Sequence, residues 1–147
     1  MYYEKLTLEQ IEEFLKETDK MFPVAISEKT DIRKYARKLY EHATICAEIK
    51  DGRIVSAVFG YTNDTSSKLG YVSAVATLPE ARRNHYASQL IEEFLEVSKA
   101  VGLEAVHLYA KKENVAAVMM YKKLGFCGLH LKDEQRPEDV HLIRYIY

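Results

Sequence analysis

The residues that most directly suggest chemistry lie where a strand is expected to give way to a helix. Arg82 and Arg83 stand just before the helix expected over residues 85–101. The first backbone amides of a helix have no partners within it and carry partial positive charge. Together with two guanidinium groups, they would form a site suited to phosphate or diphosphate. An arginine pair before a helix also occurs in ordinary solvated turns, so this pattern needs support from elsewhere in the chain.

A tyrosine and an asparagine on a later helix form the second group of candidates. Asn114 stands at the start of the helix expected over residues 114–124, and Tyr121 lies further along it. A phenol can donate a proton to a leaving group during group transfer. Tyr121 also shares a helix face with Ala117 and Leu124, which is the pattern of a core-facing aromatic. Spacing alone leaves both interpretations of Tyr121 open.

Hydrophobic periodicity predicts the elements that must position these residues. Apolar residues recur every three to four positions in the helical segments, and they alternate or run together in the strands. Thr7 and Gln10 form a capping box for the first helix, Pro23 ends that region, and Asp51-Gly52 is a hairpin turn signal. Helices are expected from Thr7 toward Pro23 and over residues 30–43, 85–101 and 114–124, and strands over residues 44–49, 53–61, 69–78, 105–111, 126–131 and 140–147.

The order of these elements predicts one α/β domain over residues 1–147. The segments from residue 69 to residue 111 run strand, helix, strand, and a crossover of this kind places the two strands parallel. The strands before them are joined by a tight turn and are therefore antiparallel. No repeat, low-complexity segment or linker interrupts the chain. We therefore expect a mixed, mostly antiparallel sheet with a central parallel pair and flanking helices.

Both groups of candidates resemble signatures of one enzyme family. The stretch from Arg82 to Ala87 resembles the first signature of the GNAT acetyltransferases, in which Arg or Gln, two residues, Gly, one residue, and Gly or Ala begin the helix beneath the CoA diphosphate. Asn114, followed by Tyr121 and then by Leu124-Gly125-Phe126, resembles the second signature. The resemblance covers about residues 45–131. It implies a GNAT-like fold in which the parallel strand pair is splayed, and it implies acetyl-CoA as the co-substrate.

The resemblance also assigns roles to particular residues. The pantetheine arm would insert between the splayed strands and bond to the backbone of Val75 and Thr77, and a backbone N–H near Val75 would polarise the thioester carbonyl. Tyr121 would be the general acid that protonates the leaving thiolate, and Asn114 would contact the cofactor through its amide. The catalytic residues implied are thus Tyr121 and Val75. The cofactor-binding residues implied are Val75, Ala76, Thr77, Arg82, Arg83, Asn84, His85, Tyr86, Ala87, Ser88, Asn114, Ala117 and Tyr121.

His85 departs from the family pattern, because it stands where the family has its first glycine. Glycine there lets the backbone approach the diphosphate and permits a positive φ. Three outcomes are open: the loop avoids a positive φ, Asn84 takes the left-handed conformation instead, or the cofactor binds less tightly. Ala87, at the second small position, preserves the close approach at the helix start.

The acceptor is expected to be a primary amine of a small molecule, which attacks the thioester directly. No motif of the chain identifies that amine. Glu41, Tyr61 and Asp64 are candidates for the base that removes its proton, although a carboxylate at a helix end or in a polar loop is usually only solvated. A non-catalytic module that binds acyl-CoA or a protein partner is the alternative function.

Composition and charge narrow the partners, location and metal content that are expected for the protein. The net charge of −1, from 21 basic and 22 acidic residues, gives no electrostatic signature of nucleic acid or an anionic membrane as partner. No apolar run reaches the ~20 residues that span a bilayer, and the first residues do not resemble a signal peptide, so a cytoplasmic protein is expected. Cys46 and Cys127 are expected to be free thiols, and no metal site is expected. A C-terminal strand at the sheet edge would suit a homodimer.

Overall fold

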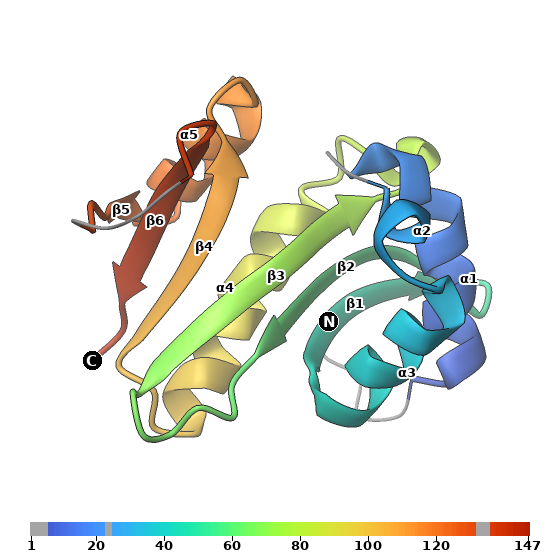
Figure 1. The fold of residues 1–147 in the computed structure, drawn as a ribbon, viewed down its shortest axis with the longest axis horizontal. Helices are drawn as coiled ribbons and strands as arrows, with labels where there is room; N and C mark the ends of the chain where they lie inside the picture. Colours follow the sequence, from blue (N-terminus) through green and yellow to red (C-terminus); the bar gives the residue numbers. More distant parts are fainter. Residues whose placement is uncertain (1–5, 23–24, 132–135) are drawn as a thin grey trace.

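A six-stranded mixed sheet forms the frame of the protein (Figure 1). In the computed structural model, which describes residues 6–22, 25–131 and 136–147, the strands lie in the order β1-β2-β3-β4-β6-β5. They are β1 (Thr44–Lys50), β2 (Arg53–Tyr61), β3 (Leu69–Thr77), β4 (Ala105–Lys111), β5 (Cys127–Gly128) and β6 (Asp139–Tyr145). The helices are α1 (Leu8–Thr18), α2 (Ile26–Lys29), α3 (Ile32–His42), α4 (Tyr86–Ala100) and α5 (Val115–Lys123), with 3-10 turns at Asp19–Met21 and Pro79–Ala81. β3 and β4 pair in parallel and the other neighbours pair antiparallel, which confirms the predicted α/β class.

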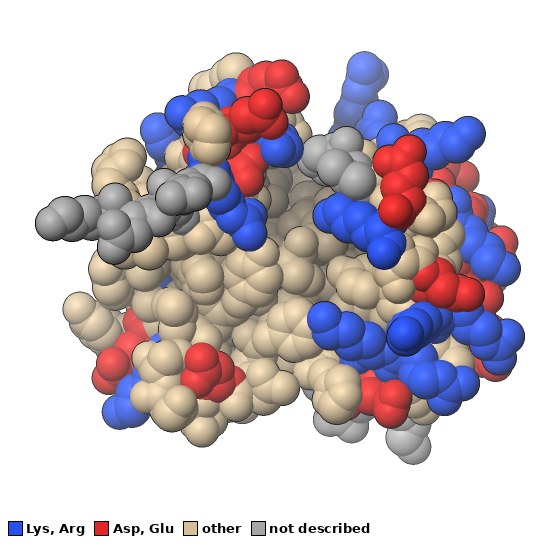
Figure 2. All heavy atoms as spheres, viewed as in Figure 1, with Lys and Arg blue, Asp and Glu red and all other residues tan. Residues whose placement is uncertain are grey.

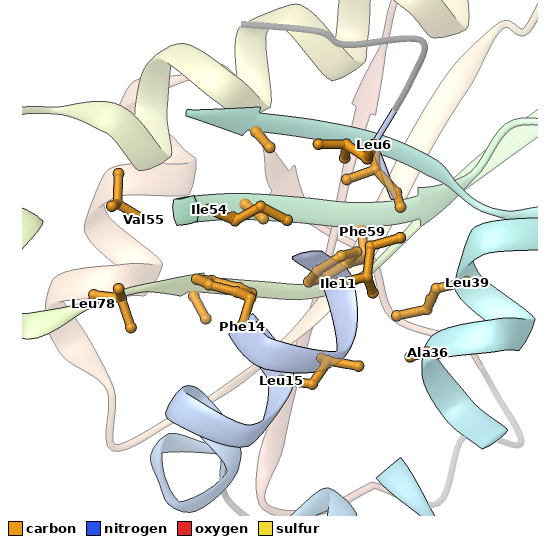
Figure 3. Packing of buried hydrophobic residues seen from close by; sticks show 14 of the residues in the cluster. Leu6, Ile11, Phe14, Leu15, Ala36, Leu39, Ile54, Val55, Phe59 and Leu78 are labelled. Atoms are coloured by element: carbon orange, nitrogen blue, oxygen red, sulfur yellow. The ribbon is translucent and has the colours of Figure 1, made fainter. Parts of the chain in front are cut away.

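Helices α1 and α3 pack on one face of the first three strands. Thr7 caps α1 through the predicted capping box, since its hydroxyl accepts from the Gln10 amide at 3.1 Å and its own amide donates to the Gln10 side chain at 2.9 Å. Asp31 caps α3 by accepting from the first amides of that helix. Between the helices and the sheet lies a buried cluster, shown in Figure 3, that includes Ile11, Phe14, Leu15, Ala36, Leu39, Ile54 and Phe59. This packing fixes the N-terminal half against the strands.

Helix α4 packs on the opposite face and connects β3 to β4. Successive residues of a strand point to opposite faces, so each strand contributes to both cores. The second core contains Val58, Val72, Leu90, Ile91, Phe94, Val106 and Leu108, all of them buried. The helix therefore crosses between the two parallel strands as the sequence predicts, and it is held in place by residues buried from Leu90 to Ser98.

The parallel pair is joined over only part of its length. Its register runs from Leu69 opposite Ala105 to Val72 opposite Leu108. Both strands continue beyond this point, β3 to Thr77 and β4 to Lys111. They diverge there, so that the ribbon shows a widening gap between them (Figure 1). This gap is the splay that the resemblance implied.

A β-bulge lies where the two strands begin to separate. Gly60 pairs with Val72 and Phe59 pairs with Ala74, so Ser73 is an extra residue on β3. An extra residue bends its strand and increases the local twist. The hydroxyl of Ser73 donates to the carbonyl of Phe59 at 3.2 Å, which holds the bulge to β2. We infer that the bulge turns the end of β3 away from β4.

Two expectations about the C-terminal strands are wrong. The strand expected over residues 126–131 is reduced to the two residues of β5. It begins only at Cys127, because the amide of Phe126 bonds back to the carbonyl of Tyr121 at the end of α5. The C-terminal strand is not an edge strand, because β6 lies between β4 and β5. The argument for a homodimer through that edge therefore loses its basis.

The structure also bears on one helix that was not predicted, on the two cysteines and on membrane-spanning segments. The short helix α2 was not predicted, and Pro23 lies outside the described residues, as does part of the loop expected after residue 131. Cys46 is buried and Cys127 is exposed, and both are free thiols. Burial raises the pKa of the Cys46 thiol to about 12. None of the helices in the described part of the chain has the length and apolarity needed to cross a membrane.

Replacement of Gly60 by alanine should destabilise the protein. A methyl group there would lie 2.5 Å from both the Phe94 ring and the carbonyl oxygen of Tyr71, so backbone must move. We expect the free energy of unfolding in urea to fall by about 1–3 kcal/mol, as for other overpacked sites. Gly128→Ala is the matched control, since its nearest neighbour would be 3.5 Å away at the His130 ring. Equal effects of the two substitutions would contradict this account of the bulge.

Candidate active site

The loop between β3 and α4 takes the left-handed conformation at two residues. Arg83 has a φ of 69°, and His85, at the N-cap of α4, has a φ of 59° and a ψ of 22°. The loop does not avoid a positive φ, and Asn84 does not take over the turn. His85 instead keeps the backbone conformation available to the glycine of the family pattern, at a cost of about 1–2 kcal/mol for a residue with a Cβ.

The side chain of Asn84 ties this loop together. Its amide nitrogen donates to the carbonyl of Ala81 at 2.9 Å and to that of Arg82 at 3.3 Å. The first helical hydrogen bond of α4 runs from Gln89 to His85, and the His85 side chain forms no cap. The amides of residues 86–88 therefore lie at the open end of the helix, where its dipole favours an anion.

The residues that carry these amides line a cavity of about 490 Å³ at the end of β3. Arg82 and Arg83 add positive charge on one side, and small residues of α4 and α5 keep the walls open. The lining residues are Thr77, Ala81, Arg82, Arg83, Asn84, His85, Tyr86, Ala87, Ser88, Ala116, Ala117 and Met120. Cationic groups at one end and apolar walls beside them fit a ligand with a diphosphate and a long neutral arm, such as CoA. The cavity thus brings together the whole predicted stretch from Arg82 to Ser88.

The backbone of β3 leads from this cavity into the splay. The amide of Leu78 donates to the carbonyl of Val55, so the residue pairs of this antiparallel ladder alternate from that point. By that alternation Ala76 bonds to β2, whereas Val75 and Thr77 direct their N–H and C=O groups away from β2. They point to the side from which β4 has diverged. Val75 and Thr77, but not the backbone of Ala76, are therefore placed to bond to a ligand in the gap.

Tyr121 and Asn114 occupy different surroundings from the lining residues. Tyr121 is only 7% exposed and packs edge-on against Phe126, with ring centroids 5.8 Å apart. Burial raises its pKa to about 12, so the phenol keeps its proton throughout the neutral range. It lies one helical turn beyond Ala117, which lines the cavity. Asn114 caps α5, because its side-chain oxygen accepts from the backbone amide of Ala117 at 3.2 Å. The side chain of Asn114 was expected to contact the cofactor, and its oxygen is already used in this bond.

A second hollow lies on the other face of the sheet, beside the same gap. It has a volume of about 390 Å³ and lies between β3, β4 and the N-terminal helices. Its lining includes Phe22, Ile26, Tyr35, Tyr71, Ser73, Ala74 and Tyr109. Figure 2 shows this face, with a hollow whose floor is uncharged and whose two sides carry Lys or Arg side chains. We call this hollow the acceptor cleft.

An aromatic and imidazole cluster borders the acceptor cleft, and sequence reasoning missed it. The Nδ1 of His107 lies 2.8 Å from the Nε2 of His141, within hydrogen-bond distance. The His107 ring lies 4.9 Å from the Tyr71 ring, and the Tyr109 ring stacks on His141 at 4.2 Å, by centroids. Tyr71 and Tyr109 line the cleft. His107 and His141 stand far apart in the sequence, and only the register of β4 with β6 could have brought them together.

The three candidate bases from the sequence are scattered. Glu41 is exposed near the end of α3. Asp64 lies in an exposed loop, where hydrogen bonds from Ser67 and Ser66 lower the pKa of its carboxyl and make it a weaker base. Tyr61 is half-buried on β2, and burial raises the pKa of its phenol. None of these three residues lines the acceptor cleft among the described residues.

Comparison with known proteins decides the family. The sequence profile of the acetyltransferase (GNAT) family matches residues 9–126, which is 118 of the 147 residues. The chain belongs to the GNAT family. This GNAT protein is 33% identical over 99 residues to an N-alpha-acetyltransferase of Sulfurisphaera tokodaii, with 60% of this chain and 59% of the relative covered. It is 27% identical over 95 residues to the chloroplastic GCN5-related N-acetyltransferase 6 of Arabidopsis thaliana, with 63% of this chain and 33% of the relative covered.

Solved GNAT structures share the fold at low sequence identity. Ard1 from Thermoplasma volcanium superposes with a TM-score of 0.76 at 18% identity, covering 97% of this chain and 95% of that one. PaiA N-acetyltransferase from Thermoplasma acidophilum, solved in complex with coenzyme A, gives 0.69 at 14% identity and covers 96% of each chain. The family to which the chain belongs is described as one of acetyltransferases.

Removal of the two loop arginines should weaken CoA binding. Arg82 and Arg83 line the cavity at the N-terminus of α4. Arg82→Ala and Arg83→Ala should each reduce CoA affinity by about 1–3 kcal/mol if the side chain forms a charge-assisted contact with the diphosphate. Calorimetric titration with CoA measures this, with Arg37→Ala on α3 as a control outside the cavity. Wild-type affinity in both single variants and in the double variant would contradict the assignment.

Replacement of His85 by glycine should relieve backbone strain. Glycine adopts φ near 59° without a Cβ clash, but it also loses more conformational freedom on folding, by about 0.5–1 kcal/mol. The entropy loss offsets part or all of the relieved strain, so the free energy of unfolding in urea should be unchanged or higher by up to about 1.5 kcal/mol. His42→Gly in the last turn of α3 should instead cost about 1 kcal/mol. A clear loss of stability in His85→Gly would show that the His85 side chain holds the loop.

Proposed function

We propose that this protein transfers an acetyl group from acetyl-CoA to the primary amine of a small molecule. The observation that supports this most directly is the position of two sites beside one gap in the sheet. The anion-binding cavity lies at the α4 and α5 face, and the acceptor cleft lies at the α2 and α3 face. A thioester held between β3 and β4 would be reached by an amine from the cleft.

In this proposal the backbone of β3 orients the thioester. Val75 and Thr77 direct their N–H and C=O groups into the gap, as derived from the ladder with β2. An N–H of Val75 aimed at the carbonyl oxygen stabilises the negative charge that develops there during attack. The amine nitrogen bonds to the carbonyl carbon, the carbon–sulfur bond breaks, and the sulfur leaves as a thiolate.

Tyr121 supplies the proton that the thiolate requires. A phenol whose pKa is raised by burial stays protonated, so it is always ready to donate a hydrogen bond. It is a weaker acid than an exposed tyrosine, whose pKa is about 10. Its contribution is therefore to stabilise negative charge on sulfur, with the proton following as the thiolate departs and the phenolate then regaining a proton from water.

The proton released by the amine leaves through the floor of the acceptor cleft. Tyr71 and Tyr109 line that floor and contact the rings of His107 and His141. Imidazole is the side chain whose unperturbed pKa best suits the exchange of a proton near neutral pH. The sequence candidates Glu41 and Asp64 lie elsewhere on the surface, so the imidazole pair is the better-placed proton acceptor.

Replacement of Tyr121 by phenylalanine should slow turnover while preserving cofactor binding. The ring remains packed against Phe126, and only the proton donor is lost. Loss of a general acid typically costs about 10²–10⁴-fold in rate. Thiol release from acetyl-CoA in the presence of an amine panel measures the rate, and calorimetry measures CoA affinity.

Tyr145→Phe serves as the matched control, since Tyr145 is exposed on β6 and should keep its full rate. Wild-type turnover in Tyr121→Phe would mean that Tyr121 only packs in the core. If the unaltered protein binds acetyl-CoA but releases no thiol with any amine, the non-catalytic binding module becomes the correct description.

A further inference from the structure

The charged residues of the acceptor cleft indicate which amines it accepts. Lys29 reaches the cleft from α2, whereas Lys111 and Arg136 reach it from the side of β4 and β6. Among the lining residues that the structure describes, Asp139 carries the only carboxylate. Its oxygens are shared, one lying 3.1 Å from the Lys111 ammonium and the other 3.5 Å from the Arg136 guanidinium. The described lining therefore keeps an excess of positive charge.

The position of Arg136 is set by stacking. Its guanidinium carbon lies 3.9 Å from the centroid of the Tyr109 ring, and the Tyr109 ring also stacks on the ring of His141. A guanidinium whose carbon lies over an aromatic face can still direct N–H groups to a second, planar partner. A carboxylate is such a partner, because two parallel N–H···O bonds match its geometry.

Glu138 also approaches Lys111, at 3.6 Å, but its side chain is 84% exposed. An exposed ion pair of this kind is screened by solvent and is easily exchanged for another partner. The ion pair with Asp139 raises the pKa of Lys111, which therefore stays positively charged at the cleft. Even with Glu138 included, positively charged side chains outnumber carboxylates among the described residues at the acceptor cleft.

We propose that the acceptor is a small amino carboxylate, a molecule that carries its own carboxylate besides the primary amine. This inference rests on the proposed function. The carboxylate lies between Arg136 and the two lysines, and the uncharged body of the molecule lies on the tyrosine floor. The same cations disfavour the ammonium form of the amine, which helps to deliver the neutral nucleophile. A diamine would bring a second positive charge into a positive site and is rejected.

The test compares acceptors that differ only in charge. L-phenylalanine is paired with L-phenylalaninamide, and 4-aminobutyrate with 4-aminobutyramide, which covers two distances between amine and carboxylate. A free carboxylate stabilises the ammonium form, so without recognition each amide would be the better nucleophile near neutral pH. We expect the acid of at least one pair to exceed its amide in kcat/KM by about tenfold or more, as for one charge-assisted contact. A diamine and a short uncharged peptide with a free α-amine complete the panel.

Variants locate the effect at the cleft. Arg136→Met and Lys29→Met keep the aliphatic stem and remove the charge, so each should lower kcat/KM for the acid about tenfold and leave the amide unchanged. Lys34→Met, an exposed residue of α3 outside the cleft, is the matched control. Amides that equal or exceed their acids, equal losses for acid and amide, or transfer only to the peptide or the diamine would each overturn the inference while leaving acetyl transfer established.

A binding measurement separates this inference from the proposed function. Calorimetric titration of L-phenylalanine and its amide into the protein saturated with CoA does not require turnover. Tighter binding of the acid, lost in Arg136→Met, supports the anion-binding cleft even if no thiol is released, in which case only the proposed function fails. Equal binding of acid and amide, together with equal rates, overturns the assignment of the acceptor.

Discussion

The separation of β3 from β4 is the constraint on which the rest of the structure depends. A parallel pair that stayed joined along its whole length would satisfy its own backbone groups and leave no space between the strands. Ser73 prevents this, because the bulge it forms against β2 turns the last residues of β3 aside. Gly60 makes the bulge possible, since any side chain there would meet the Phe94 ring and the backbone of Tyr71. The gap between β3 and β4 thus depends on the close packing around Gly60.

Much of this arrangement could be predicted from local sequence signals. The capping box at Thr7 and the turn at Asp51-Gly52 are short-range interactions, and the structure contains both. The stretch from Arg82 to Ser88 combines a strand end with a helix start, and together with the family resemblance this predicted a site where the structure has a cavity. Long-range register could not be predicted in the same way. β5 is short because Phe126 bonds to the end of α5, which no pattern in residues 126–131 reveals.

The acceptor cleft shows the same limit more clearly. Its residues come from α2, α3, β3, β4 and the start of β6, and no two of these segments form a motif. His107 and His141 had no spacing that marked them, yet the pairing of Leu108 with Leu142 brings their rings together. His85 is the opposite case. The family pattern places a residue with a positive φ at this position, and the structure has one there, whereas residue propensity alone would place the positive φ at Asn84. Asn84 is the better left-handed residue, but its side chain is needed to hold the Ala81 carbonyl.

The outward-facing backbone of Val75 and Thr77 links ligand binding to the stability of the sheet. A ligand that bonds to these groups acts as a neighbouring strand for the end of β3, and it extends the hydrogen-bonded ladder across the gap. Binding to the folded state alone stabilises a protein by an amount that rises with the logarithm of ligand concentration above the dissociation constant. Amide hydrogen exchange along residues 73–77 should accordingly slow as CoA saturates the protein, while exchange in β2, which is paired on both sides, serves as the reference for global unfolding. The concentration of acyl-CoA would thereby set how often the end of β3 opens to amide exchange.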